Sequence, residues 1–179
     1  MHAWVLIGIL IMAFVEQFSA GEPPCALCIM QRIAFMLAAT GPALLLQAAH
    51  DGPLQLSDVC KAAGIMICAS LLGAAISMRQ VMLHILPGSP GYGGIIGGYH
   101  LYTWALVAFV CSLIASGLQV LCLPLMVQAR EPDAIARIVA RPTVLSLKLI
   151  LVANILSVMS EAGLAWDVPS NPVTYLLFR

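Results

Sequence analysis

The chain has 179 residues, of which 61% are hydrophobic and 9% are charged, and its formal net charge at pH 7 is zero. Soluble domains carry about 25% charged residues, so this composition excludes an ordinary soluble fold and favours a protein whose apolar surface faces a lipid bilayer. The balanced charge gives no indication of a nucleic-acid partner, and the length suits a single domain.

Five stretches of the chain approach or exceed the roughly 20 apolar residues that a helix needs to cross a bilayer. The first stretch lacks the basic segment and the cleavage site of a signal peptide, so we expect it to be retained as a span. The fifth contains Lys148, close enough to one end for its amine to reach the lipid headgroups. The sequence therefore predicts one all-α integral membrane domain over residues 1–179, a polytopic transmembrane helical bundle with spans at about 2–17, 29–49, 62–86, 101–128 and 142–162.

The connections between these spans predict the orientation of the bundle. Lysine and arginine concentrate on the cytoplasmic side of membrane proteins. Here they cluster in the second-to-third and fourth-to-fifth connections, at Lys61, Arg130, Arg137 and Arg141. We therefore expect a cytoplasmic N-terminus and an external C-terminus. Residues 131–141 are expected to form a short interfacial helix of their own, since Pro132 and Asp133 suit a helix start.

A cysteine pair stands out in the polar segment before the second span. Pro23 and Pro24 precede it, and proline suits the first turn of a helix, so Cys25 and Cys28 are predicted in that first turn. The free N–H groups and the positive dipole end of a helix start stabilise a thiolate. Arg32 lies one turn beyond Cys28 and would add a fixed positive charge on the same face. We expect Cys25 to be the more exposed of the two cysteines.

The spacing alone leaves more than one role open for this pair. Redox exchange fits a C-x-x-C dithiol at a helix start, and a structural or silent pair is the alternative. The sequence has no second C-x-x-C and Ile29 stands where c-type haem attachment would need histidine, so we expect neither zinc nor haem and predict no metal site. The remaining cysteines lie in or beside apolar runs and are interpreted as small hydrophobic residues: Cys60, Cys68, Cys111 and Cys122.

Two parts of the chain resemble the family of disulfide bond formation protein B (DsbB). The first comprises residues 14–17 (FVEQ) and 22–35 (EPPCALCIMQRIAF), in which Pro-Cys-x-x-Cys-x-x-Gln-Arg is far more specific than C-x-x-C alone. The second comprises residues 79–81 (RQV) and 86–87 (LP), which are similar to the end of the family's third helix. The resemblance covers roughly residues 3–87, about half of the chain.

The resemblance implies a DsbB-like four-helix core, extended here by a fifth span, in a multi-pass protein of the bacterial inner membrane. Such a core passes electrons from a periplasmic thioredoxin-fold thiol protein to a membrane quinone of the ubiquinone type. Carried over to this chain, Cys25 and Cys28 would be the catalytic pair next to the quinone, on the periplasmic side. Arg32 would lie beside the quinone, and Gln17 and Arg79 would be further residues of its pocket.

The chain also departs from the family pattern. DsbB-type proteins carry a second cysteine pair in the external loop between helices three and four, but residues 87–100 contain no cysteine. Two hypotheses follow. In the first, the chain is a quinone-linked thiol oxidoreductase whose Cys25 exchanges directly with an outside thiol. In the second, it is a non-catalytic accessory subunit of a larger complex, and its outer loop and tail contact other membrane subunits.

Overall fold

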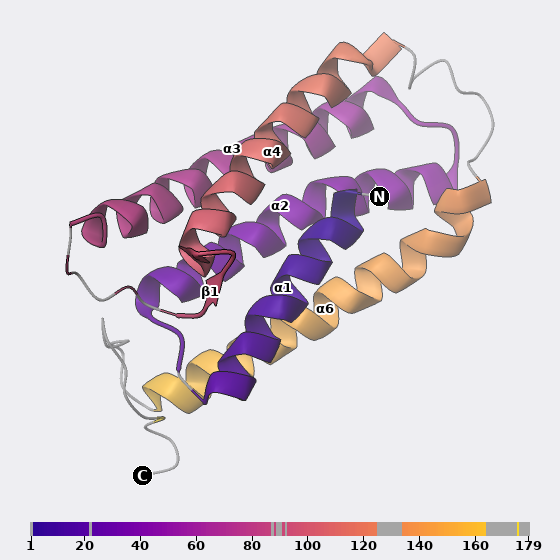
Figure 1. The fold of residues 1–179 in the computed structure, drawn as a ribbon. Helices are drawn as coiled ribbons and strands as arrows, with labels where there is room; N and C mark the ends of the chain where they lie inside the picture. Colours follow the sequence, from indigo (N-terminus) through magenta and orange to yellow (C-terminus); the bar gives the residue numbers. More distant parts are fainter. Residues whose placement is uncertain are drawn as a thin grey trace.

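The computed structural model describes residues 2–21, 23–86, 88, 91, 93–124, 134–163 and 175. This part of the chain forms five long helices and one short antiparallel hairpin (Figure 1). The helices are α1 (His2–Ala20), α2 (Ala26–Asp51), α3 (Leu56–Leu83), α4 (Leu101–Leu121) and α6 (Ala134–Ala162), and the strands are β1 (Ile95–Ile96) and β2 (Tyr99–His100).

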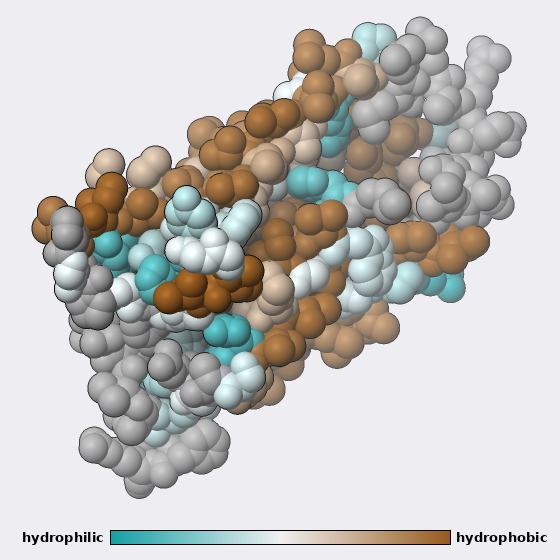
Figure 2. Space-filling view, in the orientation of Figure 1, coloured by the Kyte–Doolittle hydropathy of each residue, from teal (hydrophilic) through white to brown (hydrophobic). Residues whose placement is uncertain are grey.

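All five helices are long and apolar enough to cross a membrane. Large apolar side chains such as Phe18, Leu72 and Leu149 are exposed on their outer faces, and Figure 2 shows apolar residues spread along the flanks of the visible helices. A surface of this kind is stable when lipid rather than water is the solvent. The prediction of an all-α polytopic membrane bundle is confirmed.

A local capping interaction sets the start of α3. The helix begins at Leu56, ahead of the expected start near residue 62. The Gln55 N–H donates to the Asp58 carboxylate at 3.1 Å, which satisfies a backbone group that a helix start otherwise leaves without a partner. The polar residues Asp58 and Lys61 therefore lie within the first turns of the helix and not in a loop.

The prediction of a separate interfacial helix is wrong over residues 134–141, and residues 131–133 lie outside the described part of the chain. Helix α6 runs without a break from Ala134 through Pro142 to Ala162. Pro142 lacks the N–H that would bond the carbonyl one turn earlier, but the Thr143 hydroxyl donates to the adjacent Val139 carbonyl at 2.7 Å. The carbonyl that loses its partner is that of Ile138, which the Thr143 hydroxyl does not reach, and membrane helices tolerate such a proline inside a span.

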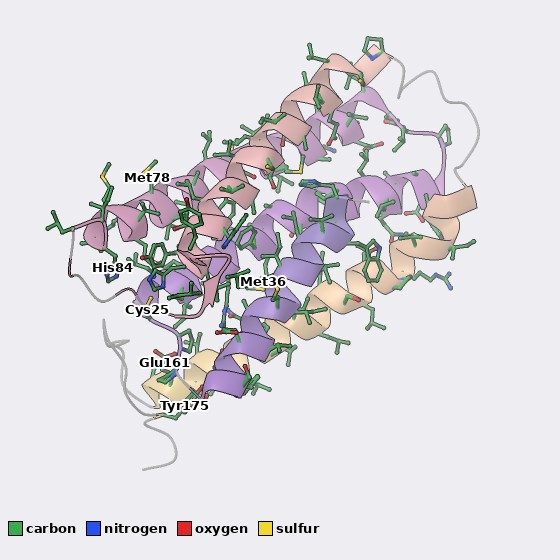
Figure 3. The ribbon with its side chains drawn as sticks, in the orientation of Figure 1. Cys25, Met36, Met78, His84, Glu161 and Tyr175 are labelled. Atoms are coloured by element: carbon green, nitrogen blue, oxygen red, sulfur yellow. The ribbon has the colours of Figure 1, made fainter. Side chains whose placement is uncertain are left out.

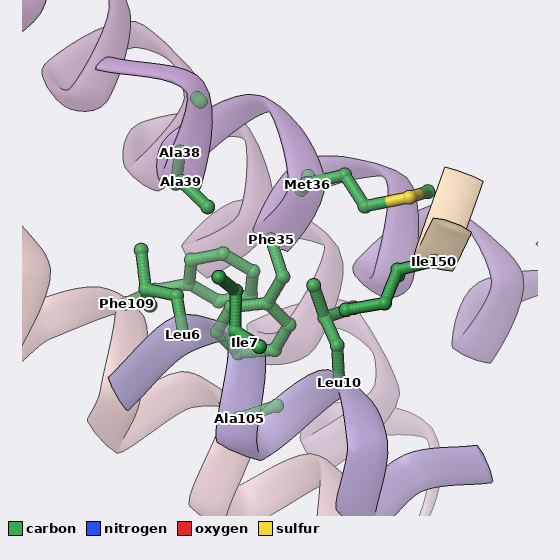
Figure 4. Close-up of a cluster of buried hydrophobic side chains, with 12 residues drawn as sticks. Leu6, Ile7, Leu10, Phe35, Met36, Ala38, Ala39, Ala105, Phe109 and Ile150 are labelled. Carbon is green, nitrogen blue, oxygen red and sulfur yellow. The ribbon is translucent and has the colours of Figure 1, made fainter. Parts of the chain in front are cut away.

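Helix α2 is the central element of the bundle. It packs against α1, α3 and α6, and in Figure 1 it lies between the α3–α4 pair and the α1–α6 pair. The main apolar cluster forms where α1, α2 and α4 meet (Figure 4). There, Leu6, Ile7 and Leu10 of α1 are buried beside the stacked rings of Phe35 and Phe109, whose centroids are 3.9 Å apart.

Two glycines let α3 approach its neighbours closely. A Cβ atom at Gly73 would overlap the ring of Phe109, which is fully buried, and a Cβ atom at Gly41 would overlap the Ala62 carbonyl oxygen. Small residues at such positions allow membrane helices to pack with their backbones near one another. The position of α3 against α2 and α4 therefore depends on the absence of side chains at Gly41 and Gly73.

We predict that Gly73→Ala destabilises the bundle by about 1–3 kcal/mol, because the added methyl group forces the Phe109 ring out of its stack. Gly64→Ala is the matched control on the same helix. A Cβ atom there meets nothing within 4 Å, and alanine favours helix over glycine, so stability should be unchanged or slightly higher. Unfolding in detergent, followed by circular dichroism, measures both. Equal stability of the two variants would contradict the role given to Gly73.

Candidate redox site

The first turn of α2 holds both cysteines of the pair. Cys25 is the N-cap residue, with φ −69° and ψ 161°, and its sulfur accepts a hydrogen bond from the Cys28 N–H at 3.3 Å. The two Sγ atoms are 2.7 Å apart, so a disulfide between them requires only a small movement of the side chains. Cys25 precedes the membrane-spanning part of α2, and its hydrogen bond with the Cys28 sulfur, together with burial, raises the pKa of its thiol. In the reduced pair, this shift favours the protonated form of Cys25.

The exposure of the two cysteines is the reverse of what the sequence suggested. Cys25 is 5% exposed, whereas Cys28 is partly exposed. The reason is the capping geometry, since the Cys25 side chain turns back over the first turn to accept the Cys28 N–H and does not point outward. The residue nearer the start of the helix is therefore the better covered one.

Two buried glutamines connect the pair to α3. The Gln31 side-chain amide donates to the Gln80 carbonyl oxygen at 2.9 Å. The Gln80 amide nitrogen in turn lies 3.5 Å from the Cys25 sulfur and 3.6 Å from the Cys28 sulfur. The amide hydrogens of Gln80 thus face both sulfurs and favour negative charge on either one.

Arg32 is buried one turn beyond Cys28, with 7% of its surface exposed. Its guanidinium donates to the Gln17 carbonyl oxygen at 2.5 Å and to the Ala13 backbone carbonyl at 2.9 Å. It also lies over the Phe14 ring, 4.7 Å from the centroid. All of these partners are uncharged, so none of them neutralises the positive charge.

Gln17 extends this network from α1 to α6 and the tail. Its carbonyl oxygen accepts from Arg32, and its amide nitrogen donates to the Ser157 hydroxyl at 2.9 Å and to the Tyr175 hydroxyl at 3.0 Å. Figure 3 shows Tyr175 at the same end of the bundle as Cys25. The site is therefore assembled from α1, α2, α3, α6 and Tyr175.

A cavity of about 430 Å³ opens beside Cys28 and Arg32, between α1, α2, α4 and the hairpin. The hairpin is fixed on α4 by the Trp104 side-chain N–H, which donates to the Ile96 carbonyl at 2.9 Å, and by the Leu101 N–H, which donates to the Gly94 carbonyl at 3.1 Å. The other lining residues combine apolar side chains with polar groups near Cys28; they include Ile9, Leu10, Met12, Ala13, Glu16, Gln17, Pro23, Pro24, Gln31, Phe35, Gln80, Tyr102, Ala105, Val107 and Ala108.

The structure does not bring Arg79 to this cavity. The Arg79 side chain is exposed on α3, whereas the next residue, Gln80, is buried and lines the cavity. Gln17, Cys28 and Arg32 all line it as well. No three His, Cys, Asp or Glu side chains in the described part of the chain are arranged to hold a metal ion.

Sequence reasoning missed four residues of this network, although a signal was available for two of them. Gln31 and Gln80 both lie in the stretches that resemble the DsbB family, and polar side chains inside membrane helices usually face the protein interior. Ser157 and Tyr175 gave no such signal, because 140 and 158 residues separate them from Gln17.

The similarity to known proteins lies in the part of the chain that carries the cysteine pair. The family model for disulfide bond formation protein DsbB matches residues 1–91, which is 91 of 179 residues. A relative named Disulfide bond formation protein B from Chromobacterium violaceum is 43% identical over 75 residues, covering 42% of this chain and 43% of the relative. A relative of the same name from Chromohalobacter salexigens is 41% identical over 75 residues, covering 42% of each chain.

The chain spans less than half the length of these curated relatives. No solved structure is significantly similar. The family match contains α1, α2 and α3. It therefore includes the cysteine pair, Arg32, and the two glutamines Gln31 and Gln80. Helices α4 and α6, which complete the cavity and the Gln17 network, lie outside it.

Proposed function

This chain belongs to the DsbB family of disulfide bond formation proteins, and on that premise we propose that it is a thiol–disulfide oxidoreductase of the bacterial inner membrane. In this proposal Cys25 and Cys28 pass electrons from a thioredoxin-fold thiol protein on the periplasmic side to a membrane quinone of the ubiquinone type. The observation that carries the proposal is that Cys28 and the guanidinium of Arg32 line one cavity.

The residues around this cavity fit a quinone head group. A quinone is a flat ring with two carbonyl oxygens, and it takes up two electrons and two protons when it is reduced. Tyr102 and Trp104 offer flat walls for such a ring, and Arg32 offers N–H groups for a carbonyl oxygen. Met12 and Val107 line the cavity and are also exposed on the outer surface, so an isoprenoid tail could stay in lipid while the ring is bound.

The thiol chemistry uses only the sulfurs of this chain and of its partner. A thiolate of the partner attacks the Cys25 sulfur, the bond between Cys25 and Cys28 breaks, and Cys28 leaves as a thiolate. A second partner thiol then resolves the mixed disulfide, and Cys25 is left as a thiol. Arg32 and the Gln80 amide stabilise the Cys28 thiolate. Re-forming the disulfide from the Cys25 thiol and the Cys28 thiolate releases two electrons, which the quinone can accept, and one proton.

One observation favours the second candidate function, a non-catalytic subunit of a larger membrane complex. Cys25 is 5% exposed, and residues 87–100 contain no cysteine that could relay electrons to it. A partner thiolate must therefore reach a covered sulfur. An accessory subunit would not require that access.

The distribution of positive charge supports a periplasmic position for the cysteine pair. Lys61 lies in the second turn of α3, and Arg141 lies near the start of α6. Both helices begin at the end of the bundle opposite the start of α2, where Cys25 is the N-cap residue (Figure 1). Basic residues of this kind stay on the cytoplasmic side, which leaves Cys25 outside.

We predict that cysteines placed at the two ends of the bundle are labelled from opposite sides. In a background that lacks the native cysteines, Gly97→Cys in the hairpin should react with a membrane-impermeant maleimide in intact cells. Ser57→Cys at the start of α3 should react only after the membrane is permeabilised. The inverse pattern would contradict the proposed orientation, and labelling of both from one side would contradict the topology itself.

We predict that Cys28→Ala traps a partner covalently through Cys25, because the lone Cys25 thiolate attacks the disulfide of an oxidised partner, one partner sulfur leaves as a thiolate, and Cys28 is absent to release the mixed disulfide. Cys25→Ala should trap none, since it removes the sulfur that forms the mixed disulfide. Non-reducing gels of membranes from each variant give the measurement. Trapping by neither variant, together with normal membrane assembly of the double variant, would favour the accessory subunit over the oxidoreductase.

We predict that Arg32→Met lowers the amount of quinone that copurifies with the protein, because a buried charge-assisted hydrogen bond contributes about 1.5–3 kcal/mol, or roughly 10- to 100-fold in affinity. Arg79→Met is the matched control, since Arg79 is exposed and does not line the cavity. Extraction and chromatography measure the quinone, and circular dichroism reports separately on folding. Equal quinone loss in both variants would argue against the cavity as the binding site.

A further inference from the structure

Helix α6 places a carboxyl group in the interior of the bundle. Glu161 is 0% exposed, and neither of its side-chain oxygens has a hydrogen-bond partner among the described residues. Figure 3 shows it at the same end of the bundle as Cys25 and Tyr175. A buried carboxylate without partners is costly, and ionisable residues retained inside membrane helices usually serve a function. Glu161 lies outside the family match, so its role has to be inferred from its surroundings.

A chain of hydrogen-bonded residues connects the face of α6 that carries Glu161 with Arg32. Glu161 is one turn beyond Ser157 on α6, so both side chains lie on the same face of the helix. Ser157 bonds Gln17, and Gln17 accepts from Arg32. Arg32, Glu161 and Cys28 lie within electrostatic reach of one another.

Among the described residues, Arg32 has no salt-bridge partner. Its hydrogen-bond acceptors are the neutral carbonyl groups of Gln17 and Ala13. The ion pair found among the described residues, His50 with Asp51, lies at the opposite end of α2. A guanidinium always carries its charge, and a buried charge favours one nearby charge of opposite sign. Two groups here can supply it: the Cys28 thiolate when the pair is reduced, and the Glu161 carboxylate.

We propose that Glu161 is the alternative counter-ion of Arg32 and exchanges one proton with each turnover of the Cys25–Cys28 pair. When the disulfide is reduced, its S–S bond breaks and the pair gains two electrons. Cys25 takes one proton, Cys28 remains a thiolate paired with Arg32, and Glu161 takes the second proton. When the disulfide re-forms, Cys25 and Glu161 give up these two protons, and the carboxylate of Glu161 again neutralises Arg32. The two electrons pass to the quinone of the proposed function, on which this inference rests, and its reduction consumes two protons.

In the part of the chain that the structure describes, few other titratable groups lie near Glu161. Helices α1 and α2 pack against α6. On α2, Arg32 and Cys28 interact electrostatically with Glu161. The Tyr175 hydroxyl accepts a hydrogen bond from Gln17, which also bonds Arg32. The carboxyl group in this part of α1, that of Glu16, contacts Gly94 of the hairpin. Glu16 is therefore the competing candidate for a proton carrier at the cavity.

Infrared difference spectroscopy tests the inference without any quinone. Oxidised protein in detergent is reduced with dithiothreitol, which has no carboxyl group, and the two spectra are subtracted. The native protein should gain the C=O stretch of a protonated carboxylic acid on reduction. Glu161→Gln should lose this band while keeping the shape of the side chain. Glu161→Asp should retain a shifted band, and Asp51→Asn, which removes an exposed carboxylate at the far end of the bundle, should leave the band unchanged.

A second readout is the dithiol–disulfide ratio in a fixed glutathione buffer. In Glu161→Gln the oxidised state leaves Arg32 without a counter-ion, so the equilibrium should shift toward the dithiol by about three- to tenfold. Glu161→Asp should restore most of the native ratio, which a merely structural role of Glu161 would not explain.

The outcomes separate this inference from the proposed function. If the pair cycles between dithiol and disulfide but the band is absent from the native protein, or survives in Glu161→Gln, the inference fails and the oxidoreductase proposal stands. Loss of the band in Glu16→Gln in place of Glu161→Gln would overturn it as well. If alkylation and mass measurement find no disulfide under any oxidising condition, the proposed function itself fails.

Discussion

The end of the bundle that carries Cys25 is arranged around a guanidinium held in an apolar interior. Removing a charged group from water costs several kcal/mol even after the protein relaxes around it. For Arg32 this cost is offset by hydrogen bonds to Gln17 and Ala13 and by the face of the Phe14 ring. These contacts come from α1, so the position of α1 against α2 is tied to the arginine. The same charge lies one turn from Cys28, where it favours a thiolate.

Close helix packing brings the remaining polar groups to that charge. Because Gly41 carries no side chain, α3 can lie close to α2, and Gln80 reaches Gln31 and both sulfurs. The stacked rings of Phe35 and Phe109 fill the space just beyond, where α2 meets α4. The polar side chains and the tightly packed apolar side chains thus lie in adjacent layers along the same helices. The cavity opens where these two layers meet.

The sequence predicted the features that depend on local chemistry, and the structure added those that depend on rotation and long-range pairing. Hydropathy located the five helices, and the prolines before Cys25 located a helix start. The exposure of Cys25 was predicted wrongly, because the direction of an N-cap side chain depends on the hydrogen bond that it makes. The sequence predicted Arg79 in the pocket, but the neighbouring residue Gln80 faces it. Successive residues on a helix point about 100° apart, so an error of one position changes the face. Glu161 could not be assigned to the site, because no local pattern shows which face of α6 meets α1.

The hydrogen bond between Gln17 and Ser157 has a consequence for the biogenesis of the protein. These partners are 140 residues apart, in the first and the last of the described helices. Bacterial and other ribosomes add about 5–20 residues per second, so roughly 7 to 28 s pass between synthesis of the first partner and synthesis of the second. During that interval the amide of Gln17 faces lipid, water or the insertion machinery without its final acceptor. Helix α6, which lies beyond the family match, is therefore also the helix whose synthesis completes the polar interior.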